Sequence, residues 1–146
     1  MARRLRITLD GVEAVARLHE NAAPKTVVRL WAALPLEERL RHVRWSGDAG
    51  YRMVSKLADS THLADNTHTV ENPVSFYPSA GIVFRWEHGE IAFCYGQAQA
   101  RDHMRVAAWA CHVGTLEDNA AAFLDKVQAT ASEGAKPIRL AREAEG

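Results

Sequence analysis

Apolar and polar residues alternate at the start of the chain in two short runs. Residues 3–9 alternate, Asp10-Gly11 follows, and residues 12–18 alternate again. A two-residue Asp-Gly connection between alternating runs is typical of a β-hairpin, because these residues tolerate the backbone angles of a tight turn. The chain therefore begins with a predicted hairpin.

The spacing of apolar residues changes to that of a helix after residue 20. The segment Asn21-Ala-Ala-Pro24-Lys-Thr26 precedes four apolar residues at helical spacing, Val27, Leu30, Trp31 and Leu34. Asparagine and threonine can cap exposed amide groups, and proline is tolerated in the first turn of a helix. We expect a helix here that Pro35 ends or interrupts.

The middle of the chain predicts further strands. Residues 42–48 and 51–54 are expected to be two strands that meet at the turn 46–50, where glycine provides unusual backbone angles. The polar stretch from Lys56 to Asn72 predicts a long loop. Three later runs, of which the last two are joined tightly by His88-Gly89, are rich in β-branched and aromatic residues: 74–76, 82–86 and 91–95.

The last third of the chain predicts a strand, a helix and a strand. Residues 106–113 favour a strand, although local propensity also permits a helix. Thr115-Leu-Glu-Asp118 is similar to a capping box, so a helix is expected from there to Gly134. Its apolar face consists of Leu116, Ala120, Phe123, Leu124 and Val127. Residues 136–140 predict a short strand, which Pro137 favours at the edge of a sheet.

Composition agrees with a folded, mainly β domain. A chain of 146 residues fits one domain, 1–146, and its 25% charged and 47% hydrophobic residues are typical of globular proteins. Lys and Arg total 18, as do Asp and Glu, so no net field attracts a polyphosphate and no nucleic-acid partner is expected. Neither a signal peptide nor a run of about 20 apolar residues is present, so we expect no membrane partner and a cytoplasmic location.

Several short motifs in the chain resemble those of a known family. They are Ala23-Pro24-Lys25-Thr26, Leu34-Pro35, Trp45-Ser46-Gly47, Glu71-Asn72-Pro73, Gly81-Ile82-Val83-Phe84 and Tyr95-Gly96. Together with the order of the predicted elements, they look like the DUF3830 family of uncharacterised bacterial proteins, which are cyclophilin-like. The resemblance spans nearly the whole chain. It implies a closed β-barrel of about eight strands with two α-helices that cover its ends.

Resemblance to true cyclophilins implies peptidyl-prolyl isomerase activity, in which an arginine donates hydrogen bonds toward the prolyl amide and an apolar pocket holds the proline ring. Arg44 matches that arginine. The segment Ala49-Gly50-Tyr51-Arg52-Met53 replaces the Phe-x-x-x-Gln-Gly-Gly-Asp-Phe segment of the isomerases, and Val106 stands where they have a pocket histidine. Cyclophilin-like barrels also form domains of allophanate hydrolase and oxoprolinase-type enzymes, which implies an accessory role in amide or lactam metabolism as another alternative.

One arginine and several aromatic residues are candidates for a ligand pocket. Arg44, Trp45, Tyr51, Phe93 and Tyr95 could line a concave site, with the guanidinium binding a carboxylate or carbonyl and the rings stacking on a planar ligand. The aromatic residues Phe84 and Trp86 could extend it. The alternative is core packing, because side chains from one face of each strand fill a small barrel.

A metal site is a weaker hypothesis. The polar loop contains His62, Asp65 and His68, and folding could add His42 or His103. Neutral imidazoles and a carboxylate suit zinc or nickel, but this spacing matches no metal signature. We expect solvated loop histidines, no metal and no cofactor.

Two other reactive residue types also favour structural roles. Ser46 lacks the Gly-x-Ser-x-Gly context of a nucleophile and is interpreted as a turn residue. Cys94 and Cys111 lie in apolar, strand-like segments and are expected to be buried thiols rather than a disulfide.

The function expected from the sequence is binding of a small-molecule or peptide ligand near Arg44 and Trp45, with catalytic residues unknown. A homo-oligomer is a separate, structural alternative, because four tryptophans and exposed strand edges in a neutral protein could form an interface.

Overall fold

The computed structural model describes residues 3–59, 70–102 and 104–143. Its helices are α1 (Pro24–Ala33) and α2 (Ala120–Glu133), and a short 3₁₀ turn, η1, spans Ser55–Leu57. Its strands are β1 (Arg4–Leu9), β2 (Val12–Leu18), β3 (Leu36–His42), β4 (Gly47–Met53), β5 (Pro73–Val74), β6 (Gly81–Arg85), β7 (Glu90–Ala98), β8 (Ala110–Asp118) and β9 (Lys136–Arg142).

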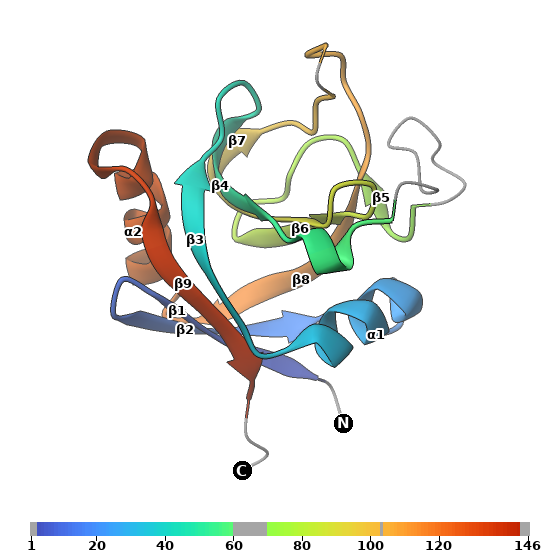
Figure 1. The fold of residues 1–146 in the computed structure, drawn as a ribbon, viewed down its shortest axis with the longest axis horizontal. Helices are drawn as coiled ribbons and strands as arrows, with labels where there is room; N and C mark the ends of the chain where they lie inside the picture. The colour runs from blue at the N-terminus through green and yellow to red at the C-terminus, as the bar shows by residue number, and fades with distance from the viewer. Residues whose placement is uncertain (1–2, 60–69, 103, 144–146) are drawn as a thin grey trace.

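Antiparallel pairing of these strands closes a barrel. The order around it is β2-β1-β9-β3-β4-β7-β6-β8, and β8 pairs with β2 to complete the circle. The short β5 pairs with the first residues of β8, with Pro73 opposite Cys111, whereas β2 pairs with the last residues of β8. In Figure 1, α2 and α1 lie on opposite sides of this barrel. The expected fold class, a closed barrel of about eight strands with two helices, is confirmed.

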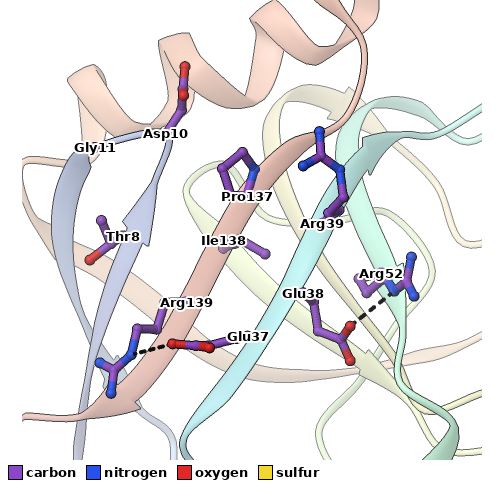
Figure 2. Close-up of a pocket in the computed structure, with 10 residues that line it drawn as sticks. All are labelled: Thr8, Asp10, Gly11, Glu37, Glu38, Arg39, Arg52, Pro137, Ile138 and Arg139. Atoms are coloured by element: carbon purple, nitrogen blue, oxygen red, sulfur yellow. Dashed lines mark ion pairs between the residues drawn. The ribbon is translucent and has the colours of Figure 1, made fainter.

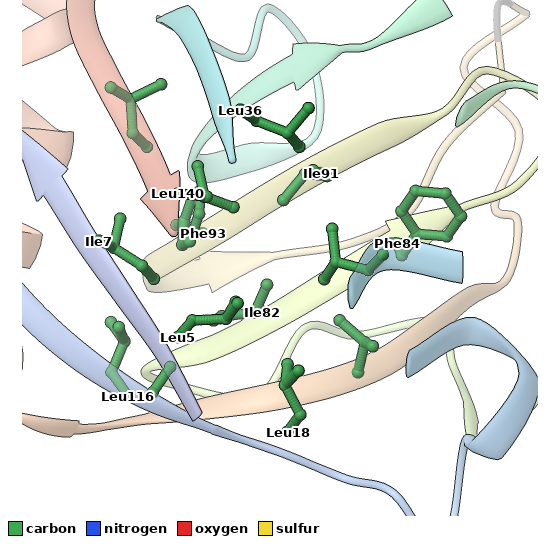
Figure 3. Close-up of a cluster of buried hydrophobic side chains, with 14 of the residues drawn as sticks. Leu5, Ile7, Leu18, Leu36, Ile82, Phe84, Ile91, Phe93, Leu116 and Leu140 are labelled. Carbon is green, nitrogen blue, oxygen red and sulfur yellow. The ribbon is translucent and has the colours of Figure 1, made fainter. Parts of the chain in front are cut away.

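Alternate strand residues fill the inside of the barrel. Figure 3 shows side chains from several strands converging on one cluster, and all of them are buried: Leu5, Ile7, Leu18, Leu36, Ile82, Phe84, Ile91, Phe93, Leu116 and Leu140. Phe123 of α2 joins this cluster, with its ring edge-to-face to Phe93 at 5.3 Å between centroids. Burial of these aliphatic and aromatic groups is the main stabilising contribution to the fold.

A second, smaller cluster lies on the opposite face of β7. Ile91 and Phe93 belong to the barrel interior, whereas Ala92 and Cys94 point the other way, as strand alternation requires. The segment after β5 and the segment after β7 cover this outer face, because Tyr77 N–H donates to Ala98 and Ala100 N–H to Ser75. Small side chains allow the close approach: Ala49, Ala92, Ala98, Ala100, Ala108 and Ala110. These covering segments build one wall of the site described below.

Residues 36–54 differ from the expectation in register. We expected strands at 42–48 and 51–54 and a turn at 46–50, but β3 spans Leu36–His42, the turn is 43–46 and β4 spans Gly47–Met53. Leu36 and Leu40 alone in β3 point inward. The polar residues between them break the apolar alternation that would identify a strand in the sequence. Glycine at position 50 is required by close packing and not by a turn, since a Cβ there would lie 2.8 Å from Leu40 Cδ2.

The strand expected at 106–113 overlaps the observed strand only at residues 110–113, and the helix start expected at Thr115 was wrong. β8 runs from Ala110 to Asp118 and pairs with β2, with Leu116 opposite Ala16 in the barrel. The helix begins only after Asn119, whose φ of 59° and ψ of 31° turn the chain out of the strand. Pairing with β2 therefore overrides the capping-box pattern of residues 115–118. Gly134 ends the helix as expected.

The edge position expected for the last strand was wrong as well. β9 lies between β1 and β3, and it runs on to Arg142. Pro137 is tolerated because it lies one residue beyond the last ladder pair with β1, Leu9 opposite Ile138. There its carbonyl accepts a hydrogen bond from Asp10 N–H at 3.0 Å. The Pro137 nitrogen, which has no hydrogen to donate, therefore faces the hairpin turn and not the strand ladder.

Two of the motifs noted in the sequence meet at the start of α1. No side chain of the N-cap residue Ala23 caps the helix. Instead Glu71 accepts hydrogen bonds from Lys25 N–H at 3.1 Å and Thr26 N–H at 2.7 Å. The Thr26 hydroxyl donates to Glu71 at 2.7 Å and accepts from Trp86 Nε1 at 3.0 Å. A carboxylate at a helix N-terminus also stabilises the helix dipole.

In the described parts of the chain, neither helix is both long and apolar enough to cross a bilayer. Of the long loop expected at 56–72, residues 60–69 lie outside the described residues.

Candidate functional site

One hollow on the described part of the protein lies over the sheet formed by β1, β9, β3 and β4. It has a volume of about 570 Å³ and is lined mostly by charged side chains. Figure 2 shows that these already pair with one another: Arg139 with Glu37 at 3.3 Å and Arg52 with Glu38 at 3.6 Å. Five of its six charged side chains form ion pairs within the protein, and the sixth, Arg39, donates to the Ala135 carbonyl, so this groove offers a ligand little unmet binding capacity.

A smaller pocket of about 200 Å³ lies at the outer face of β4 and β7, and we call it the Arg44 pocket. Its walls come from the β3–β4 turn, β4, the β6–β7 hairpin and the segment after β7. The lining residues are Val43, Arg44, Trp45, Ser46, Tyr51, Met53, Arg85, His88, Glu90, Arg101 and Asp102. A second hollow of about 430 Å³, beside the exposed Phe76, shares Ser46 and Arg101 with it.

The structure brings together three of the five candidate ligand-binding residues. Arg44, Trp45 and Tyr51 all line the Arg44 pocket. The Trp45 side chain is 42% exposed, and the Arg105 guanidinium lies 5.6 Å from its ring centroid. Arg44 itself is exposed and forms no ion pair with an acidic residue in the described part of the chain. Its guanidinium is therefore available to an anionic or carbonyl ligand.

The other two candidates lie elsewhere. Phe93 is 1% exposed inside the barrel, where Phe84 also lies. Tyr95 packs on the barrel core, and its hydroxyl is 2.8 Å from His42 Nε2. Trp86 packs there as well and donates to Thr26. None of these four aromatic residues lines the Arg44 pocket.

The hydrogen bonds of His42 indicate its tautomer. Nδ1 is 2.8 Å from the Val43 carbonyl, which can only accept, so Nδ1 carries the proton. In the neutral imidazole, Nε2 then accepts from the Tyr95 hydroxyl. With both nitrogens occupied, His42 is not oriented to activate Ser46. This agrees with the interpretation of Ser46 as a turn residue.

Sequence reasoning missed four charged residues of the pocket, Arg85, Glu90, Arg101 and Asp102, of which Arg85 is the most buried. Arg85 is 5% exposed, although it bears a charge. Its Nε donates to Glu87 at 3.0 Å and its Nη1 to the Arg101 carbonyl at 2.7 Å. Nη2 lies 3.0 Å from the same Glu87 oxygen but makes no hydrogen bond within the described residues. Arg85 thus fixes the segment after β7 on the barrel.

Glu90 is the second missed residue. It is 8% exposed, lines the pocket, and its carboxyl group makes no hydrogen bond to any residue that the structure describes. Burial raises the pKa of this carboxyl group, and the positive charge of Arg85 offsets part of that rise. The nearby Tyr77 phenol is buried too, which raises its pKa, and the Glu90 charge adds to this effect.

Arg101 is the third missed residue. Its Nη1 donates to the Arg105 carbonyl at 2.9 Å and its Nη2 to Gln99 Oε1 at 3.0 Å. Neither partner carries a charge, so Arg101 adds a second positive charge to the pocket. Asp102 forms no direct ion pair with it within the described residues, and Asp102 Oδ1 accepts from the Met104 and Val106 amides.

The two cysteines are free, buried thiols, as expected. Burial raises the pKa of Cys111 to about 12, and it also raises the pKa of Cys94. Thiols that stay protonated are poor nucleophiles. The candidate metal ligands His62, Asp65, His68 and His103 lie outside the described residues.

A pair of titratable residues lies away from the pocket, where His19 and His112 are in contact beside Thr115. Their ring centroids are 4.6 Å apart, and the Thr115 hydroxyl is 2.9 Å from His19 Nε2 and 3.4 Å from His112 Nε2. Burial lowers the pKa of both imidazoles. The positive charge of Arg17 lowers that of His19 further, and His19 lowers that of His112.

Acidification is therefore expected to destabilise the fold through this pair. In the unfolded chain both imidazoles regain a pKa of about 6.5, so the unfolded state binds protons at higher pH than the folded state. The contribution of the two neutral imidazoles to the free energy of unfolding is complete above about pH 6.5. It is lost as the pH falls through their lowered pKa values in the folded state. Urea titrations across this range measure it.

The control is the double variant His19→Gln, His112→Gln, which should show a weaker loss of stability on acidification. Glu90 acts in the opposite sense, because its raised pKa favours folding at low pH, and it is present in both proteins. An identical pH dependence in the two proteins would contradict the assignment to the histidine pair.

Comparison with known proteins agrees with the architecture. A family model described as "Protein of unknown function (DUF3830)" matches residues 5–142. The structure of McbB in complex with tryptophan is similar, with a TM-score of 0.70 and 19% identity over 97% of this chain and 45% of the McbB chain. The solution structure of the hypothetical protein AF2241 from Archaeoglobus fulgidus has a TM-score of 0.64 and 17% identity over 97% of this chain and 95% of that protein.

These similarities support the fold. The chain spans less than half the length of the McbB chain. At identities below one fifth, both structures are similar to this chain in fold alone, a cyclophilin-like barrel. No curated protein matches the chain.

Proposed function

The chain belongs to the DUF3830 family of proteins of unknown function, and we propose that it binds a small molecule or short peptide group in the Arg44 pocket. The ligand carries a carboxylate or carbonyl oxygen beside an apolar group. The observation that supports this most strongly is the position of the exposed Arg44 guanidinium beside Trp45 and Tyr51 in one pocket.

The chemistry of the pocket favours such a ligand. A guanidinium group donates two parallel hydrogen bonds to a carboxylate, and an arginine without an acidic partner can form them without first breaking an ion pair. Trp45, Tyr51 and Met53 offer apolar surface next to it. Tryptophan, which McbB holds in its similar structure, combines both groups and is a suitable first probe.

Replacement of Arg44 tests the proposal. We expect Arg44→Ala to weaken the binding of tryptophan or indole-3-propionate by about tenfold or more, because a charge-assisted hydrogen bond is lost. The control is Arg41→Ala, which removes an exposed arginine of β3 outside the pocket and should leave binding unchanged. Calorimetry and amide chemical shifts measure both. Equal affinity in Arg44→Ala, or no shift at Tyr51 and its neighbours with any carboxylate probe, would contradict the proposal.

A second candidate function is peptidyl-prolyl isomerisation, which the juxtaposition of Arg44 with Tyr51 and Met53 favours. An arginine beside an apolar surface is what binding of a prolyl amide requires. Val106, which stands where the isomerases have a histidine, is 59% exposed and does not line the pocket. Exchange NMR on a proline peptide decides the matter, with Arg44→Ala as the control. A rate equal to the uncatalysed background removes this candidate.

A further inference from the structure

One wall of the Arg44 pocket carries an acid whose partner the protein does not supply. In the sheet, Glu90 lies opposite Met53 of β4 on one side and Arg85 of β6 on the other. These side chains face the outer surface of the barrel, and all three line the pocket. Glu90 is thus placed beside the apolar part of the pocket and at the same time beside a buried guanidinium.

Arg85 does not neutralise Glu90 by a direct ion pair. Its Nε and Nη2 both lie 3.0 Å from Glu87 Oε1, and its Nη1 donates to the Arg101 carbonyl. The Glu90 residue is 8% exposed, and its carboxyl group makes no hydrogen bond within the described residues. A largely buried carboxylate without a hydrogen-bond partner is disfavoured, and the nearby Arg85 charge offsets only part of this cost, so a ligand that brings a hydrogen-bonding cation to this position gains from the interaction.

Apart from Asp102, whose carboxylate accepts from two backbone N–H groups, the unpaired charges elsewhere in the pocket have the opposite sign. Arg44 and Arg101 have no acidic partner within the described residues, and they attract an anionic group. The pocket therefore offers separate sites for a negative and a positive group, with Trp45, Tyr51 and Met53 as the apolar surface of the same pocket.

We propose that Glu90 binds a positively charged amino group, so that the pocket takes an amine-bearing carboxylate, such as an amino acid with an apolar side chain. This inference rests on the proposed function and names its ligand class. Glu90 selects among carboxylates, while Arg44 and Arg101 hold the carboxylate itself.

The alternative is that Glu90 stays protonated and donates a hydrogen bond to a ligand oxygen. Its buried position raises its pKa, which makes this form accessible. The two cases predict opposite effects of pH: amine binding weakens as Glu90 is protonated, whereas oxygen binding strengthens. The ionisable groups around Glu90 that shape this titration are Arg85, Glu87, His88, Tyr77, Arg101 and Asp102, with Arg44 and Tyr51 further along the pocket.

The experiment compares each amino acid with analogues that lack one charged group. L-tryptophan, indole-3-propionate and tryptamine form one series, and L-leucine, 4-methylpentanoate and isopentylamine form another. We expect the full protein to bind at least one of the amino acids about tenfold or more tightly than its deaminated analogue, and this preference to weaken at acidic pH. Calorimetry measures the affinities, and chemical shifts at Tyr51 and Glu90 locate the binding.

Variants assign the preference to Glu90. Glu90→Gln should bind the deaminated carboxylates as well as the wild type does and should lose the preference for the amino acids. Arg44→Ala should weaken both kinds of carboxylate. Glu37→Gln, at an exposed acid outside the pocket, should change neither. Circular dichroism confirms that each variant is folded.

The outcomes separate the two proposals. Equal binding of amino acids and deaminated carboxylates, or an amino-acid preference that survives in Glu90→Gln, overturns the role of Glu90 and leaves the proposed function intact. Tighter binding at acidic pH overturns it as well. Absence of binding by every carboxylate in both series overturns both. If Glu90→Gln does not fold, the wild-type preference and its pH dependence decide.

Discussion

Gly47→Ala is expected to lower the free energy of unfolding by about 4 kcal/mol, as the combined cost of a strained backbone and a steric clash. Gly47 has a φ of 117°, which residues with a Cβ rarely adopt. A Cβ would lie 2.3 Å from the Gln97 carbonyl oxygen and 2.9 Å from Ala98 Cα. Both atoms belong to the backbone of β7, which pairs with β4 at this position, so neither can move away without breaking the ladder.

The matched control is Gly134→Ala. Gly134 also has a positive φ, 87°, but no atom lies within 4 Å of a Cβ placed there. This variant bears the backbone strain alone and should lose about 1–2 kcal/mol. Urea denaturation gives both values. If the two variants lose the same stability, the clash with β7 is not what requires glycine at position 47.

Gly47 also follows the turn that presents Arg44 and Trp45 to the pocket. A folded Gly47→Ala protein is therefore expected to bind carboxylate probes more weakly, because the displaced turn moves both side chains. Weaker binding in this variant alone would report on turn geometry rather than on contact with the ligand.

Phe93→Ala is expected to lower the free energy of unfolding by about 3–5 kcal/mol, the range for removing a buried phenylalanine. Phe93 is 1% exposed in the barrel core and loses its edge-to-face contact with Phe123. The milder Phe93→Leu keeps most of the apolar volume and should lose about 1 kcal/mol. Neither change touches the Arg44 pocket, so ligand affinity should be unchanged in the folded protein.

Trp45→Ala provides the opposite case. Trp45 is 42% exposed and lines the pocket, so its loss should change stability by about 0.5 kcal/mol and weaken binding of a planar ligand. Stability and affinity thus separate the two residues, although both are aromatic candidates of similar appearance in the sequence. Loss of affinity in Phe93→Leu equal to that in Trp45→Ala would contradict this separation.

Elements with local signals could be predicted from the sequence. The first hairpin follows from alternation and Asp10-Gly11, and α1 follows from the helical spacing after Pro24. β3 could not be identified in this way, because Leu36 and Leu40 are its only inward apolar residues and the others are charged. Residues 115–118 suit a strand or a helix start locally, and only pairing with β2 decides between them.

The candidate site could be predicted only where its residues are close in sequence. Arg44, Trp45 and Tyr51 belong to one hairpin, so their proximity was foreseeable. Phe93 was misplaced because the register of β4 and β7 puts Tyr51 opposite Ala92, and alternation then turns Phe93 to the inside. Arg85 and Glu90 flank the predicted His88-Gly89 connection, but no local pattern shows that Glu90 also lies opposite Met53 of β4.

The position of β9 also determines when this protein can fold during synthesis. β1 and β3 are not neighbours, since Lys136–Arg142 lies between them and pairs with both. When the chain has emerged from the ribosome as far as α2, every other strand of the barrel is present, but the sheet still has a gap between the hairpin and β3. Contacts so distant in sequence are slow to form, so a nascent chain exposes these two edges to other proteins until the final strand emerges.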